Sequence, residues 1–168
     1  GRPLLRWGWL RAASLGLLAL SGGRRGEVGQ HLLAGRTVEA EAACREWMVL
    51  FPDRFYLELQ RTGRTDEEDY LHAAVSLAEQ LDCPVVATHE VCFITEDEFE
   101  AHEARVCIGE GRTLNDPRRP RNYSQQQFLR SPQEMAELFS DIPEALENTV
   151  HIAQRCSVAI SLGEAFLP

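Results

Sequence analysis

Three side chains that could bind a metal ion follow one another in the stretch CPVVATHEVCFI. The stretch begins with apolar residues typical of a buried strand and continues into His89, Glu90 and Cys92. Imidazole, carboxylate and thiolate groups bind zinc, and the first two also bind manganese. A fourth candidate, Glu58, belongs to the earlier stretch RFYLELQ. Spacing alone leaves two interpretations open: a metal site, or ordinary polar residues at the ends of strands.

No other arrangement of residues in the sequence is typical of catalysis. The sequence contains no G-x-S-x-G, Walker A or G-x-G-x-x-G motif. Cys92 and His89 are close in sequence, but catalytic cysteine–histidine pairs form in space rather than along the chain. Four further histidines fall in predicted helices, where we expect them to face solvent: His31, His72, His102 and His151. We therefore predict no catalytic residue in this chain.

Parallel strands would bring Glu58 close to the later candidates, and the sequence predicts such strands. Residues 55–60 alternate as a strand, residues 66–81 carry a helical apolar stripe, and residues 84–87 form the next strand. A strand–helix–strand unit with short connections has parallel strands, whose carboxyl ends lie at one edge of the sheet. The other predicted elements of the first half are a strand at residues 14–21, ended by Gly22 and Gly23, and helices at residues 25–33 and 37–50, the latter with Thr37 as N-cap. The predicted fold class is α/β.

The second half of the chain is predicted to be mostly helical. Thr95 with Glu98 and Ser131 with Glu134 each match a capping box, which marks the start of a helix. The predicted elements that follow are helices at residues 96–108, 131–139 and 141–156 and a short strand, VAISL, at residues 158–162.

Between these helices lies an irregular segment rich in arginine and proline, residues 109–130. Its arginines could contact nucleic acid phosphates, or they could pair with acidic groups of this protein or of a neighbour. Because few aromatic residues are interleaved with them, we favour the second interpretation. The arginines that we select as candidates for partner or interdomain contact are Arg112, Arg118, Arg119 and Arg121.

The composition is that of a globular protein with one core, since 44% of the 168 residues are hydrophobic and 26% are charged. A formal charge of −9 disfavours non-specific binding of the whole surface to DNA or to an anionic membrane. Five widely spaced cysteines without a C-x-x-C motif predict reduced thiols, as in the cytoplasm. The apolar run near the N-terminus resembles a signal peptide but is too short to span a bilayer, and we favour a buried strand. Because the chain begins with Gly1 rather than Met, we expect a piece of a longer protein.

Long stretches of the sequence resemble the alpha subunits of bacterial DNA polymerase III, the replicative C-family polymerases. The most specific stretch is EAHEARVCIGEGRTLNDPRRPRNYSQQQFLRSPQEMAELFSDIPEALENTVHIAQRC; the others are GLLALSGGRRGEVGQ, FYLELQRTGR and EEDYLHAAVSLAEQLDCPVVAT. The resemblance implies that residues 1–168 are the C-terminal half of a polymerase and histidinol phosphatase (PHP) domain, part of an irregular parallel α/β (TIM-like) barrel. Residues 1–94 would supply parallel β/α units, and residues 95–168 a helical and arginine-rich portion leading toward the polymerase palm.

The resemblance also implies that the candidate metal site is a remnant. In metal-binding members the later strand end reads like T-N-D-x-H, whereas here Thr88 is kept and the Asp and His positions are Glu90 and Cys92. The earlier strand of such members reads like E-I-Q-N-H-G; here Glu58 keeps the acidic position and Thr62 takes the histidine position. A thiolate disfavours manganese and magnesium, and a glutamate displaces its oxygens by one methylene relative to an aspartate. We expect no cofactor in this segment, and zinc is the ion that the remaining thiol would favour.

The resemblance further implies a fragment of a DNA-directed DNA polymerase whose catalytic aspartates and magnesium lie outside the chain. The segment's own predicted role is structural, with docking to the rest of the alpha chain and to the proofreading exonuclease (epsilon) subunit, and contact with DNA through the full-length protein. A cytoplasmic location without membrane contact is expected. The alternative is a metal-dependent phosphoesterase or an intrinsic proofreading nuclease, which would need histidines from the missing first half. A half barrel is also expected to leave two open strand edges and to be poorly stable alone.

Overall fold

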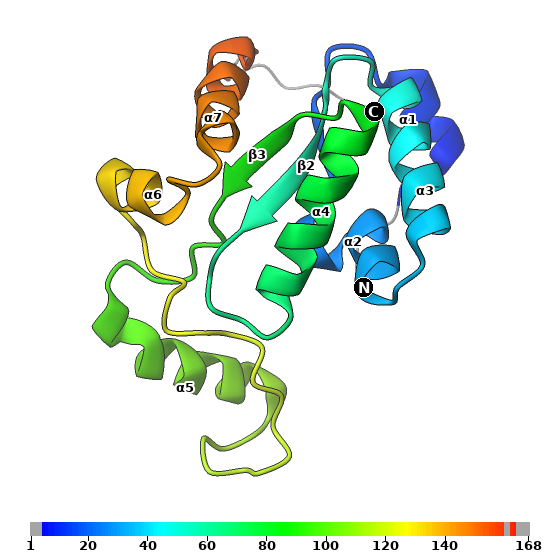
Figure 1. The fold of residues 1–168 in the computed structure, drawn as a ribbon. Helices are drawn as coiled ribbons and strands as arrows, with labels where there is room; N and C mark the ends of the chain where they lie inside the picture. Colours follow the sequence, from blue (N-terminus) through cyan, green and yellow to red (C-terminus); the bar gives the residue numbers. More distant parts are fainter. Residues whose placement is uncertain (1–4, 160–161, 164–168) are drawn as a thin grey trace.

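The computed structural model describes residues 5–159 and 162–163, and it is built on a three-stranded parallel sheet (Figure 1). The strands lie in the order β1 (Ala19–Leu20), β2 (Phe55–Gln60) and β3 (Val85–Thr88). Leu57 of β2 is opposite Val85 of β3, and both neighbouring pairs of strands are parallel. The α/β class is therefore confirmed. Within the described residues the sheet does not close into a barrel.

The described part of the chain also contains seven α-helices and two short 3-10 segments. The helices are α1 (Trp7–Ala13), α2 (Glu27–Leu33), α3 (Thr37–Leu50), α4 (Glu67–Leu81), α5 (Phe99–Glu110), α6 (Pro132–Leu138) and α7 (Pro143–Arg155), and the 3-10 segments are η1 (Gly23–Arg25) and η2 (Glu96–Glu98). Helices α2 to α7 correspond to the six helices predicted from the sequence. None of the described helices is both long enough and apolar enough to cross a membrane.

A large part of the core lies between the sheet and α4, which crosses the face of β2 in Figure 1, and residues of α2, α3 and α7 complete it. Leu57 and Leu59 share one face of β2 because they are two residues apart, and both are fully buried. Leu71 and Ala74 belong to the buried stripe of α4 that joins the same cluster. Burying each leucine side chain contributes about 1.5–3 kcal/mol, so this contact fixes the position of β2 and of the polar residues on its other face.

Helix α7 covers the outer edge of β3, which corrects the expectation of two open strand edges. Asn148 Nδ2 donates to the carbonyl of Val85 at 2.8 Å, and Thr149 Oγ1 donates to the carbonyl of Ala87 at 2.9 Å. These two carbonyls belong to the side of β3 that faces away from β2. Side chains of α7 thus satisfy acceptors that a further strand would otherwise pair with.

The strand predicted at residues 14–21 is wrong for most of its length, because β1 contains two residues. A turn precedes it, in which Gly16 adopts a positive φ of 76°. Arg54 holds this turn, since its Nη1 donates to the carbonyls of Ser14 (2.6 Å) and Leu17 (2.9 Å). Helix α1, which we did not predict, packs through Trp7 against Trp47, with ring centroids 4.8 Å apart.

Smaller corrections concern the end of the chain and one helix cap. Of the predicted strand VAISL, residues 158, 159 and 162 are irregular, and residues 160–161 lie outside the described part. Thr37 is the first residue of α3 rather than its N-cap, which is Arg36. His72 and His151 are exposed as predicted, and His31 is half-buried.

Both predicted capping boxes are confirmed. Glu98 Oε2 accepts from the amide N–H of Thr95 at 3.2 Å, ahead of η2 and α5. Ser131 Oγ accepts from the amide N–H of Glu134 at 3.2 Å, and Glu134 Oε2 accepts from the amide N–H of Ser131 at 2.7 Å. Pro132 occupies the first turn of α6, where its missing N–H costs no hydrogen bond.

Candidate functional site

The carboxyl ends of β2 and β3 meet at one edge of the sheet, and both point toward the lobe that contains α5 (Figure 1). Gln60 of β2 is opposite Thr88 of β3. Glu58 lies on the same face as Gln60, and its Oε1 accepts hydrogen bonds from Thr88 Oγ1 at 2.5 Å and from Gln60 Nε2 at 3.0 Å. The Glu58 carboxylate therefore ties the two strand ends together.

Glu90, two residues beyond β3, is bound by two arginines from different elements. Its Oε2 accepts from Arg64 Nη1 at 2.5 Å, and its Oε1 accepts from Arg25 Nη1 at 3.4 Å. Arg25 is the last residue of η1, and Arg64 lies in the loop between β2 and α4. Because both oxygens of Glu90 face positive charge, an additional cation would be repelled there.

Arg64 is buried in the middle of this edge, with a side chain that is 5% exposed. Its Nη2 donates to Gln60 Oε1 at 3.1 Å and lies 3.5 Å from Glu67 Oε1. Glu67 is also buried, in the first turn of α4, where the helix N-terminus favours a carboxylate. We did not predict Arg64 or Glu67 as site residues. The run RTGRTDEE, which places opposite charges three residues apart after a strand, was a usable signal.

Thr62, the position that the family resemblance assigns to a histidine, belongs to the same network and is fully buried. Its amide N–H and its Oγ1 both donate to the carboxylate of Glu67, the hydroxyl at 2.8 Å. Its carbonyl accepts from Ser124 Oγ. Thr62 thus closes the loop after β2 onto the start of α4, and it offers no imidazole to a metal ion.

His89 and Cys92 contact a segment that returns from the arginine-rich loop. His89 Nε2 lies 3.0 Å from the carbonyl of Phe128, so this nitrogen carries the proton in the neutral ring. Burial lowers the pKa of His89, and Arg130 lowers it further. Cys92 Sγ accepts from Gln127 Nε2 at 3.4 Å, and burial raises the pKa of the thiol. Burial therefore disfavours the thiolate form of Cys92, which is the form that binds zinc or attacks a substrate.

The four candidate metal ligands lie near one edge of the sheet but do not converge. Within residues 5–159 and 162–163, no three His, Cys, Asp or Glu side chains are grouped so that they could hold a metal ion. The two carboxylates are already bonded to hydroxyl, amide and guanidinium donors, and the imidazole to a carbonyl. These residues do not fit the metal that the resemblance implies for other members. No chemical step through a metal ion follows from this site.

The arginine-rich segment folds back on α5. Arg119 is 11% exposed, and its guanidinium pairs with the buried carboxylate of Glu103 on α5. Its Nε also donates to the carbonyl of Leu114 at 3.0 Å. Arg112 Nη1 lies 3.3 Å from Asp116 Oδ2 within the same segment. Arg112 and Arg119 are thus paired with acidic groups of the same protein, and so is Arg118, whose Nε lies 3.6 Å from Asp116 Oδ1.

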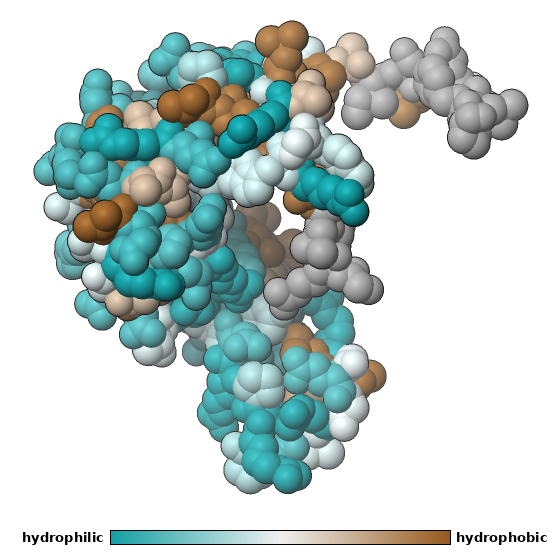
Figure 2. All heavy atoms as spheres, turned by 90° about the vertical axis from the view of Figure 1, so that its right-hand side faces the viewer, coloured by the Kyte–Doolittle hydropathy of each residue, from teal (hydrophilic) through white to brown (hydrophobic). Residues whose placement is uncertain are grey.

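Arg118 and Arg121 lie at the surface of this segment. The side chain of Arg118 is 88% exposed, and Arg121 is exposed as well. The segment that carries them lies in the lobe at the bottom of Figures 1 and 2, whose visible surface in Figure 2 is mostly hydrophilic. Contact of these arginines with a partner stays a prediction.

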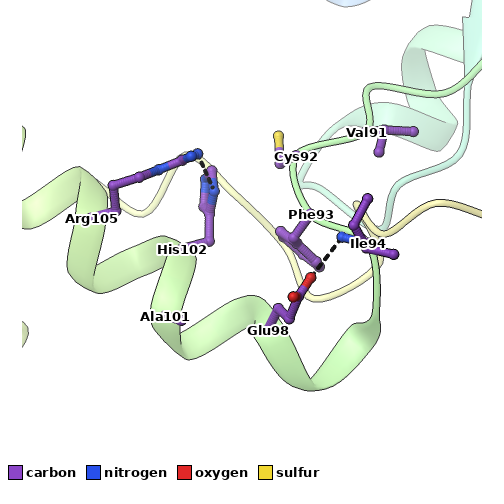
Figure 3. A pocket seen from close by; sticks show the side chains of 8 residues that line it. All are labelled: Val91, Cys92, Phe93, Ile94, Glu98, Ala101, His102 and Arg105. Atoms are coloured by element: carbon purple, nitrogen blue, oxygen red, sulfur yellow. Dashed lines mark hydrogen bonds between the residues drawn. The ribbon is translucent and has the colours of Figure 1, made fainter.

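A cavity of about 420 Å³ lies between the loop after β3 and α5 (Figure 3). Of the four candidate metal ligands, Cys92 alone lines it, so it does not unite them. His102 also lines it, with Nδ1 at 3.0 Å from Arg105 Nη2. The prediction that His102 faces solvent is wrong, because its ring packs against Phe93 and Tyr123 and is 7% exposed. Burial lowers the pKa of His102, and Arg105 lowers it further.

Comparison with known proteins found one matching family model and several similar proteins that share one name. The family model described as the PHP domain matches residues 1–62. The DNA polymerase III subunit alpha of Pseudomonas aeruginosa is 59% identical over 168 residues, which is 100% of this chain. The subunits of the same name from Vibrio cholerae and Escherichia coli K12 are 58% and 57% identical over 167 and 166 residues, 99% of this chain in each case. The chain spans 14% of the length of each of these relatives.

Proposed function

On the premise that this chain fits a fragment of a DNA polymerase III alpha subunit, we propose that it is part of a PHP domain with a structural and docking role. The whole subunit would be a DNA-directed DNA polymerase of the cytoplasm, with its magnesium-dependent chemistry outside this segment. The observation that carries the structural role is the state of the candidate ligands. Glu90 is bound by two guanidinium groups, and Glu58 is bound by Thr88 and Gln60.

The structural role rests on how the loops at the strand ends are joined. The loop after β2 is tied to α4 through Thr62 and Glu67, and to the loop after β3 through Arg64 and Glu90. Gln127 then ties the loop after β3 to the returning segment, since its Nε2 donates to the Glu90 carbonyl at 3.2 Å. Three loops that could carry a mobile active site are thereby held to one another. This arrangement suits a rigid support for the rest of the subunit.

The docking role rests on the two exposed arginines and on the residues that fix their positions. Arg119 anchors the segment to Glu103, so its neighbours Arg118 and Arg121 project from a loop that is already ordered. Pro117 and Pro120 of this segment further restrict the backbone. A preorganised loop loses little conformational entropy on binding, and exposed guanidinium groups suit bidentate pairing with carboxylates. We propose the proofreading exonuclease subunit as the partner.

Charge reversal at these two positions tests the docking role. In the full-length subunit, Arg118→Glu with Arg121→Glu should weaken binding of the exonuclease subunit by about tenfold, while extension of a primed template by the subunit alone changes less. The matched control is Arg36→Glu with Arg45→Glu, which reverses two exposed arginines at α3. Arg119 is left unchanged because its guanidinium is used inside the protein. Equal binding by wild type and the first double variant would refute the docking role.

The match to the PHP domain favours one alternative function, that of a metal-dependent phosphoesterase or intrinsic nuclease. This alternative requires Glu58 as a ligand, so Glu58→Ala should abolish any hydrolysis of a phosphomonoester or of a DNA 3′ end that depends on added Mn²⁺ or Zn²⁺. We expect the full-length wild type to show no such hydrolysis above that of Glu58→Ala. Metal-dependent hydrolysis that disappears in Glu58→Ala would favour this alternative and contradict the proposed structural role.

A further inference from the structure

The cavity between the loop after β3 and α5 combines an apolar wall with one arginine (Figure 3). Phe93 and Ile94 of the loop and Ala101 of α5 line it. Arg105 follows Ala101 by four residues, so both lie on the same face of α5. In Figure 3, Arg105 and Ile94 lie at opposite ends of the lining. The volume of about 420 Å³ is within the range of sites that bind small ligands or single side chains.

The positive charge of Arg105 is not compensated within the described part of the chain. Its Nη2 donates to His102 Nδ1 at 3.0 Å, and no carboxylate of the described residues lies within ion-pairing distance of it. A guanidinium only donates hydrogen bonds, so Nδ1 of His102 is the acceptor and the ring is neutral. Burial and the charge of Arg105 both lower the pKa of His102, which favours this neutral form. His102 therefore orients the guanidinium without neutralising it.

The carboxylates of the same region are bonded to other groups. Glu103 of α5 pairs with Arg119. Glu98, which also lines the cavity, accepts through Oε2 the amide N–H of Ile94 at 2.8 Å. It precedes Arg105 by seven residues, which is about two helical turns. One end of the cavity therefore carries an uncompensated positive charge, although the formal charge of the whole chain is −9.

We propose that this cavity binds a short peptide segment in which an apolar side chain is next to a carboxylate. The carboxylate pairs with Arg105, and the apolar side chain enters between Phe93 and Ala101. Val91 and Ile94, which also line the cavity, are 43% and 62% exposed, so its apolar surface continues outward. A peptide covers this additional surface, whereas a free small acid does not.

His102 is the positioning residue of this site. Its ring packs against Phe93 and Tyr123, with centroids 5.5 and 4.5 Å apart, and is 7% exposed. A guanidinium that is already held in one orientation loses less side-chain entropy when a partner binds. His102→Phe keeps an aromatic ring but removes the Nδ1 acceptor. It should therefore weaken binding of a peptide that uses Arg105, and leave binding of a peptide without a carboxylate unchanged.

Ligand-observed saturation-transfer NMR with the full-length subunit tests the proposal, with the peptide acetyl-Leu-Glu-Phe-amide as the probe. The neutral peptide acetyl-Leu-Gln-Phe-amide is the matched control for the carboxylate. Wild type should bind the acidic peptide with a Kd of about 1 mM and the neutral peptide about fivefold more weakly. Arg105→Gln should bind the two peptides equally. The control variant Arg36→Gln removes an exposed arginine at the start of α3 and should behave as wild type.

Ala101→Phe gives a second test that leaves every charge in place. Ala101 is exposed and lines the cavity, so the added ring should fill it and abolish binding of the acidic peptide. Equal affinity of wild type for the two peptides, or unchanged affinity for the acidic peptide in Arg105→Gln or Ala101→Phe, would refute the site. Equal weakening of both peptides in His102→Phe would refute its positioning role. Tighter binding of 4-phenylbutyrate, a free acid of the same chemistry, than of the acidic peptide would overturn the assignment to a peptide.

Discussion

Replacing Tyr70 with phenylalanine should loosen the strand-end site without changing any charged residue. Tyr70 is 1% exposed, and its hydroxyl donates a 2.8 Å hydrogen bond to the backbone carbonyl of Glu58. The substitution keeps the ring but leaves this carbonyl without its donor, which costs about 1–3 kcal/mol for a buried acceptor. At about 1.4 kcal/mol for each factor of ten, this corresponds to roughly 5- to 150-fold faster exchange of the amides that open together with β2.

Hydrogen exchange in the full-length subunit measures this effect, with peptides that cover β2 and β3. Tyr123→Phe is the matched control, because the Tyr123 ring packs against His102 in the lobe of α5 rather than against the sheet. The control should leave both strands unchanged. If Tyr70→Phe changes exchange in β2 by less than about twofold, the hydroxyl contributes little and the reasoning from burial is refuted.

The same residue predicts a response to alkaline pH. Burial raises the pKa of Tyr70 well above its ordinary value, so the folded state holds the phenolic proton more tightly than the unfolded state. This contribution to stability is fully present below about pH 10 and is lost as the pH rises beyond that value. Tyr70→Phe should therefore flatten the alkaline decrease in the free energy of unfolding. An alkaline decrease of equal slope in wild type and variant would contradict the assignment.

Three further predictions use other parts of the structure. Because the pKa of His89 is lowered in the folded state, the unfolded state takes up a proton first as the pH drops, so the free energy of unfolding should fall below about pH 6.5. Hydrogen exchange measures this fall, and His89→Asn should reduce it. The same pH profile in wild type and variant would contradict the prediction. Leu57→Ala should lower the free energy of unfolding by about 2–5 kcal/mol, because the leucine side chain is fully buried. Leu20 is 42% exposed, so Leu20→Ala should cost less. Equal losses in denaturant titrations would count against the assigned core. In the described sheet β1 has a neighbouring strand on one side only, so its other edge can pair with a second chain. The thermal transition of the isolated 168-residue chain should therefore depend on protein concentration. A sharp transition of a monomer at every concentration would overturn this expectation.

Short sequence motifs predicted the helices well, because the residues that start a helix lie within a few positions of one another. The capping boxes at Thr95 and Ser131 each depend on a glutamate three residues later, and both formed. The predicted strand at residues 14–21 failed because its conformation is decided by Arg54, which is 40 residues from Ser14 along the chain. The burial of His102 likewise depends on an aromatic ring of the later irregular segment. Contacts of this range leave no periodic pattern near the residues that they control.

At the candidate site, too, sequence reasoning predicted the features set by nearby residues and missed a contact between residues far apart in the chain. Sequence reasoning placed Glu58 near the end of one parallel strand and Glu90 just after the next, and the structure does bring these strand ends to one edge. It did not predict that Arg64 would reach Glu90, which is 26 residues away, because an arginine in a glycine-containing loop is usually solvated. The direction of one long side chain therefore determines which positive group lies closest to the Glu90 carboxylate.

The cover that α7 provides for β3 also has a consequence for the order of synthesis. Asn148 is 63 residues downstream of Val85, the residue whose carbonyl it binds. At a translation rate of roughly 5–20 residues per second, about 3–13 s separate the synthesis of the strand from that of its cover. During this interval the outer carbonyls of β3 would be available to any other extended segment of the nascent chain. A ribosome pausing between these two residues would lengthen that exposure, so codon choice between residues 85 and 148 becomes a variable in how cleanly the segment folds.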